Sequence, residues 1–330
     1  MDLKTIEDAA QLVYAWMRPT PQYAWPLLRE AVGTEVFVKH ENHTPTGAFK
    51  IRGSITFMDW LRRTHPDVGG IVTATRGNHG QGQALAATRA GMRAKIYVPF
   101  GNSSEKNAAM AAFGAELVEI GADFDEAREE AHRAALAENL FFVPNYHDAL
   151  VSGVATYALE LFRAVSDIDT VYVPIGCGSG ICGLISARDA LGLKTEIVGV
   201  VAERADYAKR SFDAGRPMEG DAPDTFADGV AVRTPVAEAF ALYSKGAARV
   251  ITVSEDAIAE AIRLIFRTTH NVAEGAGAVP LAGLMTEKAA MKGKRCAVIL
   301  CGGNIDTDVF LEVLSGKTPR GARSKATTEA

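Results

Sequence analysis

TVYVPIGCGSGICG, residues 170–183, joins a short apolar run to a loop that contains four glycines. Val171–Ile175 is almost continuously apolar, which is typical of a parallel strand that is buried on both faces. The glycines lead directly into an apolar segment of helix length. A strand, a glycine-rich turn and a helix in this order form the repeating unit of a doubly wound α/β sheet.

The same alternation extends over most of the 330 residues. Short runs rich in β-branched residues predict further strands at 35–40, 70–75, 94–99, 115–120, 140–144, 196–203, 248–254 and 295–303. Longer, Ala-rich segments predict helices at 79–90, 103–113, 123–138, 150–166, 180–191, 254–268 and 276–290. The length corresponds to about two domains. We therefore expect an α/β fold with two domains, each built on a mostly parallel twisted sheet with helices on both faces.

Charge and hydropathy exclude several classes of protein. Lys and Arg number 35 against 40 Asp and Glu, for a net charge of −5, and no basic stripe is present. No nucleic-acid partner is therefore expected. No apolar run reaches the roughly 18–20 residues of a membrane span. The start, MDLKTIEDAAQLVYAW, has acids where a signal peptide has its apolar region. We expect a soluble, cytoplasmic protein without a membrane partner.

Cysteine and histidine spacing argues against a metal site. The four cysteines form two C-x4-C pairs, Cys177/Cys182 and Cys296/Cys301, with no C-x2-C and no adjacent histidine. The seven histidines show neither H-x3-H nor H-E-x-x-H. A serine hydrolase is equally unsupported, because the chain has no G-x-S-x-G elbow. We expect no metal in the site.

Five loops follow predicted strands, at the carboxyl ends where open α/β sheets bind their ligands. They are Asn42–Gly53, Thr73–Gln81, Gly176–Gly180, Ala227–Gly229 and Cys301–Asn304. In the first loop, Lys50 stands between Phe49 and Ile51 at the start of a helix. If this face is buried, desolvation makes the lysine amine a usable nucleophile. The alternative is a surface lysine whose stem lies along apolar side chains.

Two of the loops could bind an anion. Gly77 and Gly80 in the second loop let the backbone approach a ligand at a helix N-terminus, although a simple capped turn would also explain them. The Gly176–Gly180 loop forms a nest of N–H donors suited to a phosphate. It is not a Walker A sequence. Because Gly183 completes G-x-G-x-G-x-x-G and Glu203 follows about 20 residues later, a nucleotide-binding oxidoreductase remains an alternative.

Taken in order, the loops resemble one family of enzymes. TPTGAFKIRG (44–53), TRGNHGQ (75–81), GCGSGICG (176–183), ADGV (227–230) and CGGN (301–304) are similar to the motifs of fold-type II pyridoxal phosphate (PLP) enzymes, in the branch of threonine/serine dehydratases and serine racemases. The resemblance covers about residues 15–316. It implies a tryptophan synthase β-like PLP fold. Residues 1–42 and 148–316 would form a large PLP-binding domain, residues 43–147 a small domain, and residues 317–330 a flexible tail.

The resemblance also implies roles for the site residues. Lys50 would be catalytic and carry the Schiff base to PLP, with Phe49 against the ring and Asn78 bonded to the phenolic oxygen. The other implied cofactor contacts are Gly176, Cys177, Gly178, Ser179 and Gly180 at the phosphate, Asn145, Gly229 at the ring, and Cys301 beside the pyridine nitrogen. Thr75, Arg76, Gly77, Asn78 and His79 would bind the α-carboxylate of the substrate.

The implied reaction is dehydration and deamination of a β-hydroxy amino acid, such as threonine or serine, to the 2-oxo acid and ammonia. Specialised dehydratases of hydroxyectoine or hydroxyaspartate metabolism, serine racemase and the β-replacement enzymes such as cysteine synthase remain alternatives. The cysteine synthase branch usually has S-x-K-D-R where this chain has A-F-K-I-R. The family also implies a homodimer.

The chain departs from the family pattern at three points. The racemase has a serine before the G-N-H triplet as its second proton carrier, whereas this chain has Arg76, which does not give up a proton in this range. Arg76 either orients a carboxylate or faces solvent or an acid. Glu203 matches the first acid of the family's divalent-cation site, but Lys209 stands near the second, so we expect little Mg²⁺ dependence. After Gly316 we expect no regulatory domain that responds to isoleucine.

Overall fold

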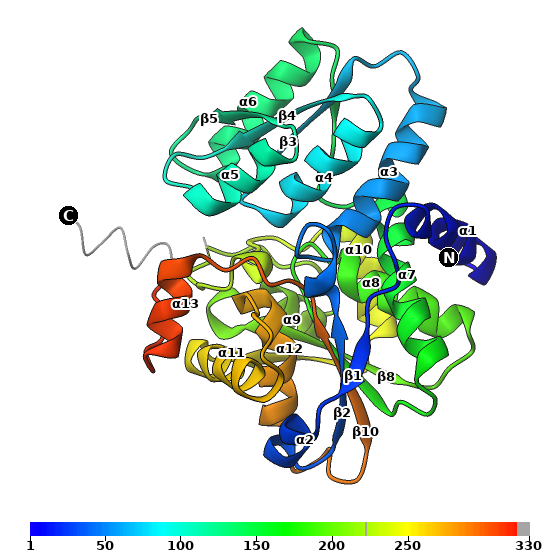
Figure 1. The fold of residues 1–330 in the computed structure, drawn as a ribbon, viewed down its shortest axis with the longest axis vertical. Helices are drawn as coiled ribbons and strands as arrows, with labels where there is room; N and C mark the ends of the chain where they lie inside the picture. The colour runs from blue at the N-terminus through cyan, green and yellow to red at the C-terminus, as the bar shows by residue number, and fades with distance from the viewer. Residues whose placement is uncertain (222, 322–330) are drawn as a thin grey trace.

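The computed structural model describes residues 1–221 and 223–321, which form two lobes (Figure 1). The lower lobe in Figure 1 contains a six-stranded sheet in the order β1-β2-β10-β7-β8-β9. Its strands are β1 (Gln22–Ala24), β2 (Glu35–His40), β7 (Thr170–Pro174), β8 (Glu196–Ala202), β9 (Arg249–Val253) and β10 (Arg295–Leu300). All neighbours are parallel except β1, which pairs antiparallel with β2.

The upper lobe contains a four-stranded, entirely parallel sheet in the order β5-β4-β3-β6. Its strands are β3 (Gly70–Ala74), β4 (Arg93–Val98), β5 (Glu116–Glu119) and β6 (Phe141–Phe142). The helices of this lobe are α3 (Lys50–Thr64), α4 (Asn78–Arg89), α5 (Ser104–Ala112) and α6 (Phe124–Ala137). Every residue of β3 is buried, as expected for a central strand that is covered on both faces.

The remaining helices pack around the larger sheet. They are α1 (Leu3–Tyr14), α2 (Pro26–Val32), α7 (Asp148–Ala164), α8 (Ser179–Ala190), α9 (Tyr207–Ala214), α10 (Ala237–Gly246), α11 (Glu255–Thr269), α12 (Gly275–Thr286) and α13 (Thr307–Leu314), with short 3₁₀ turns η1 (Glu41–His43), η2 (Glu203–Ala205) and η3 (Asp228–Val230). The first ten residues of α12, from Gly275 to Leu284, are all buried. This helix lies inside the larger core, where a helix that is apolar on all sides belongs.

The expected α/β fold with two mostly parallel sheets is confirmed. All nine strands predicted from apolar runs are present, within three residues of the expected ends. The three-residue β1 and the helices α1, α2, α9, α10 and α13 were not predicted. The short ones among them leave too few residues for a periodic pattern, so tertiary packing decides them.

The predicted domain boundaries stay a proposal, with one complication at the N-terminus. Val13 and Met17 pack into an apolar cluster with Ile51 and Ile55 of α3, so the end of the N-terminal helix contacts the smaller lobe as well. Lys317 contacts α11 through Arg263, whose Nη1 donates to the Lys317 carbonyl oxygen at 3.2 Å. The predicted tail beyond residue 321 lies outside the described residues. Within the described residues, no helix is long and apolar enough to cross a membrane.

Candidate active site

The first, third and fifth predicted loops meet at Lys50. The lysine is the first residue of α3, and the backbone just before it is tied to the end of β10. Ala48 forms a β-bridge with Gly302, and the Phe49 amide donates to the Cys301 carbonyl oxygen at 3.0 Å. The half-buried Lys50 side chain then extends toward the larger lobe, with Nζ 3.3 Å from Ser179 Oγ. The amine therefore lies at the mouth of the glycine loop.

The glycine loop forms a narrow cradle at the N-terminus of α8. Gly178 has φ +96°, a left-handed conformation that favours glycine. A Cβ on Gly176 would lie 2.3 Å from the Gly229 carbonyl oxygen, and one on Gly180 would fall 3.8 Å from Phe49 Cζ. Open N–H groups at the start of a helix bind phosphate. The loop therefore suits an anion that lies between Lys50 and α8.

Alanine at Gly178 is expected to weaken PLP binding by at least ~10-fold, because the new Cβ would lie 2.5 Å from Ala239 Cβ and φ is positive. Gly192→Ala is the matched control, since Gly192 has φ +66° but open space around a Cβ. A PLP titration of both variants separates the loss of the cradle from backbone strain alone. Equal PLP affinity in the two variants would contradict the assignment.

The second loop is joined to the fifth through amide side chains. Asn304 Nδ2 donates to Asn78 Oδ1 at 2.8 Å and to the Thr46 carbonyl oxygen at 2.8 Å. Asn78 Nδ2 in turn donates to Glu274 Oε1 at 2.7 Å. One hydrogen of the Asn78 amide is used in this bond, and among the described residues the other has no partner. The network fixes Asn78 at the start of α4, between the lobes.

Glu274 lies beside Asn78 and was not predicted from the sequence. It is 6% exposed, and burial raises the pKa of its carboxyl to about 7, although the charge of Lys106 and the hydrogen bond from Asn78 act in the opposite direction. A carboxyl that titrates near neutral pH is suited to acid–base chemistry. One sequence signal was available. Glu274 directly precedes a helix that is apolar on all sides, which favours burial of that helix, although the tertiary structure decides whether its N-cap is buried as well.

The second loop brings together residues with different exposure. Thr75 is buried and accepts a hydrogen bond from the Gly77 amide at 3.1 Å. His79 is also buried, and within the described residues its Nε2 has no hydrogen-bond partner. Burial and the charge of Lys50 lower the pKa of His79 to about 3, so the imidazole is neutral. Arg76 is exposed, and no ion pair forms between it and the part of the chain described here.

Polar contacts between the lobes close one side of the site. Lys106 Nζ, from α5, lies 2.9 Å from Asp228 Oδ2 in the turn before Gly229. The Lys106 stem packs on the second loop, since a Cβ on Gly77 would lie 2.9 Å from its Cδ. Ser103 Oγ donates to Asp306 Oδ1 at 2.6 Å.

Of the other predicted cofactor contacts, burial raises the pKa of the Cys301 thiol well above its ordinary value, with a further contribution from Glu274. This thiol therefore keeps its proton. Burial also raises the pKa of Cys177 in the glycine loop. Asn145 is half-buried between β6 and α7. Its predicted contact with the cofactor stays a prediction.

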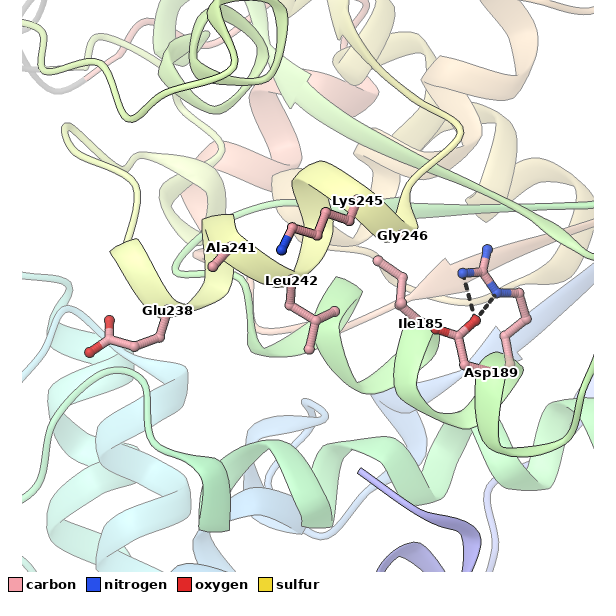
Figure 2. A pocket seen from close by; sticks show the side chains of 8 residues that line it. Ile185, Asp189, Glu238, Ala241, Leu242, Lys245 and Gly246 are labelled. Atoms are coloured by element: carbon pink, nitrogen blue, oxygen red, sulfur yellow. Dashed lines mark hydrogen bonds and ion pairs between the residues drawn. The ribbon is translucent and has the colours of Figure 1, made fainter.

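The described residues contain no group of three or more His, Cys, Asp or Glu that could hold a metal ion. Lys209, which stands where the family's cation site has an acid, forms an ion pair with Asp213. Figure 2 shows a separate surface pocket of about 480 Å³ between α8 and α10. Its lining, which includes Glu238 and Lys245, contains none of the predicted site residues.

Comparison with known proteins identifies the family of the chain. Residues 13–302 match the family described as pyridoxal-phosphate dependent enzyme. The chain belongs to this family. An L-threonine ammonia-lyase of Thermotoga maritima is 33% identical to this PLP-dependent enzyme. The match covers 95% of this chain and 78% of the Thermotoga protein. The biosynthetic L-threonine dehydratase IlvA of Pasteurella multocida is 33% identical over 89% of the chain, which spans only 58% of that protein.

A solved structure agrees with the assignment. The processed form of threonine deaminase isoform 2 from Solanum lycopersicum superposes with a TM-score of 0.89 at 29% identity, covering 95% of this chain and 88% of that one. The site fits PLP on its own geometry. A primary amine lies at the mouth of an anion cradle, Phe49 faces Gly180 across it, and the buried Nε2 of His79 lacks a partner among the described residues.

Proposed function

We propose that this PLP-dependent enzyme deaminates a β-hydroxy amino acid, with L-threonine or L-serine as substrate, to the 2-oxo acid and ammonia. The observation that carries the proposal is the Lys50 amine, which faces Ser179 of the glycine loop at 3.3 Å. The named activities of the relatives support the substrate class.

The residues that would hold PLP are those of the five loops. The amides of the Gly176–Gly180 loop would bind its phosphate, Phe49 and Gly229 would enclose the ring, and Asn78 would donate its free amide hydrogen. When bound, PLP supplies an electron sink for the bonds at the substrate Cα. The neutral Cys301 thiol, in the position that the family keeps near the ring nitrogen, leaves that nitrogen without a charged partner. This environment favours loss of a β-substituent over a long-lived carbanion.

Proton transfer would fall to Lys50. We assign its amine, which lies 3.3 Å from Ser179 Oγ of the glycine loop, as the base for the Cα proton. The amides at the start of α4 would bind the α-carboxylate, since a helix N-terminus attracts an anion. His79, neutral and buried beside them, can donate one hydrogen bond without competing for the proton.

A substrate screen tests the proposal. Holoenzyme incubated with L-threonine is expected to release ammonia and 2-oxobutanoate in equal amounts. The panel should include L-serine and β-hydroxyaspartate, because the exposed Arg76 guanidinium could pair with a second carboxylate. PLP-loaded protein that releases ammonia from no β-hydroxy amino acid would refute the proposal.

Racemisation is expected to be at least ~100-fold slower than ammonia release from L-serine, since a positioned acid typically contributes 10²–10⁴-fold and Arg76 supplies none. Arg76→Ser should raise D-serine formation. Chiral chromatography of the reaction mixtures measures both rates. If the wild-type enzyme formed D-serine as fast as ammonia, a racemase would be the better assignment.

The family's homodimer and cytoplasmic location are part of the same proposal. Light scattering of the purified protein tests the dimer directly.

A further inference from the structure

Four buried charged side chains form a cluster at the start of α3. One of them, Arg52, lies two residues after Lys50. The members of the cluster are Lys39, Glu41, Arg52 and Glu160, and each is less than a tenth exposed. They come from β2, η1 and α3, which follow one another along the chain, and from the distant helix α7. With two cations and two carboxylates, the cluster carries no net charge.

Arg52 is the centre of the cluster. Its Nε and Nη2 donate to the two carboxylate oxygens of Glu41 at 2.7 and 3.0 Å, and its Nη1 and Nη2 donate to those of Glu160 at 2.7 and 2.9 Å. Nη1 also donates to Thr156 Oγ1 at 2.9 Å, and Nη2 to Thr20 Oγ1 at 3.2 Å. Two bidentate pairs at once require the planar guanidinium fork, which lysine does not have.

The two pairs hold both ends of the segment that carries Lys50. Glu41 begins η1 before this segment, and Arg52 lies in the first turn of α3 after it. The Glu41–Arg52 pair therefore joins the two ends of this segment, as a cross-link would. The Arg52–Glu160 pair attaches the segment to α7. Lys39 adds a further bond to Glu160, with Nζ 2.5 Å from Oε2.

Helices α3 and α7 also approach each other closely at two glycines. A Cβ on Gly153 of α7 would lie 2.2 Å from the Arg52 carbonyl oxygen, and one on Gly53 would lie 2.6 Å from the Leu150 carbonyl oxygen. Buried ion pairs are weak evidence for stability, because apolar residues of similar volume often serve as well. The bonds from Arg52 to Glu160 do, however, hold the first turn of α3 against α7.

We propose that Arg52 is a positioning residue for Lys50, because its two carboxylate pairs fix the first turn of α3 and so direct the Lys50 amine toward Ser179. The lysine amine ends a flexible four-carbon stem, so its reach depends on where its Cα is held. A misplacement of about 1 Å costs on the order of 100-fold in rate. The inference rests on the proposed function, in which Lys50 bonds to the cofactor aldehyde.

The test replaces Arg52 with lysine, which keeps the charge and removes the planar fork. In Arg52→Lys, covalent attachment of PLP to Lys50, measured by borohydride trapping without substrate, should slow by at least ~10-fold. The kcat for L-threonine should fall by ~100-fold with KM changed by less than about threefold. The Kd for PLP should change by a smaller factor than the rate of covalent attachment, because the glycine loop is unchanged.

Arg249→Lys is the matched control. Arg249 also bonds two carboxylates, Glu287 and Glu196, but it begins β9, at the opposite end of the sheet from the site. A purely structural role predicts that both variants lower the unfolding temperature while attachment and kcat stay at the wild-type level, and this outcome would overturn the proposal. If Arg52→Lys does not fold, Thr156→Val can be used instead, because it removes a single bond to the guanidinium. This variant should also lower the attachment rate and kcat with little change in KM, by smaller factors. Failure of the wild-type chain to attach PLP at Lys50 would instead refute the proposed function.

Discussion

Replacement of Lys50 by alanine is expected to lower ammonia release from L-threonine by at least ~10³-fold. The variant loses both the amine that bonds to the cofactor and the base for the Cα proton, and a positioned base by itself typically contributes 10²–10⁴-fold. PLP should still bind through the glycine loop, since Gly176–Gly180 is unchanged. The measurements are the steady-state rate, borohydride trapping of PLP on the chain, and mass spectrometry of the Lys50 peptide.

Lys245→Ala is the control for this experiment. Lys245 is an exposed lysine of α10 that lines the surface pocket in Figure 2 and is not among the predicted site residues, so its loss should leave the rate and the trapping unchanged. A Lys50→Ala variant that kept the wild-type rate would show that another group handles the proton. Trapping of PLP on a different lysine of the wild-type chain would refute the assignment of Lys50 itself.

Glu274→Gln is expected to stabilise the protein without cofactor by about 3 kcal/mol at pH 8 and by less than about 1 kcal/mol at pH 5. The folded-state pKa of Glu274, about 7, lies above the ordinary value of 4.5, so the folded state binds the extra proton between these pH values. The free energy of unfolding of the wild type therefore falls by about 1.4 kcal/mol per pH unit as the pH rises from about 4.5 to 7. Glutamine resembles the protonated acid and removes this loss.

Urea unfolding at both pH values measures the difference between variant and wild type. Glu129→Gln, an exposed acid of α6, is the control and should be neutral at both. Glu274→Gln should also lower kcat/KM for L-threonine by at least ~10-fold, because an acid kept buried at a cost to stability is typical of a functional site. Equal stability at pH 8 together with full activity would remove Glu274 from the site.

Much of this protein follows from local patterns. Short apolar runs that alternate with helix-length segments are enough to predict the parallel sheets, because buried strands and helices differ in periodicity. The glycines at 176–180 and the lysine at position 50 were likewise visible in sequence, since tight turns and helix starts depend on neighbouring residues. The order of the five loops then indicated the family.

Other features needed the folded chain. Glu274 becomes an acid with a raised pKa only because α12 carries it into the core, beside Asn78 from the other lobe. Arg52 finds Glu160 more than a hundred residues away, and Lys106 finds Asp228 across the gap between the lobes. Burial and the pairing of distant charges depend on which surfaces come together, and residue spacing along the chain does not encode that.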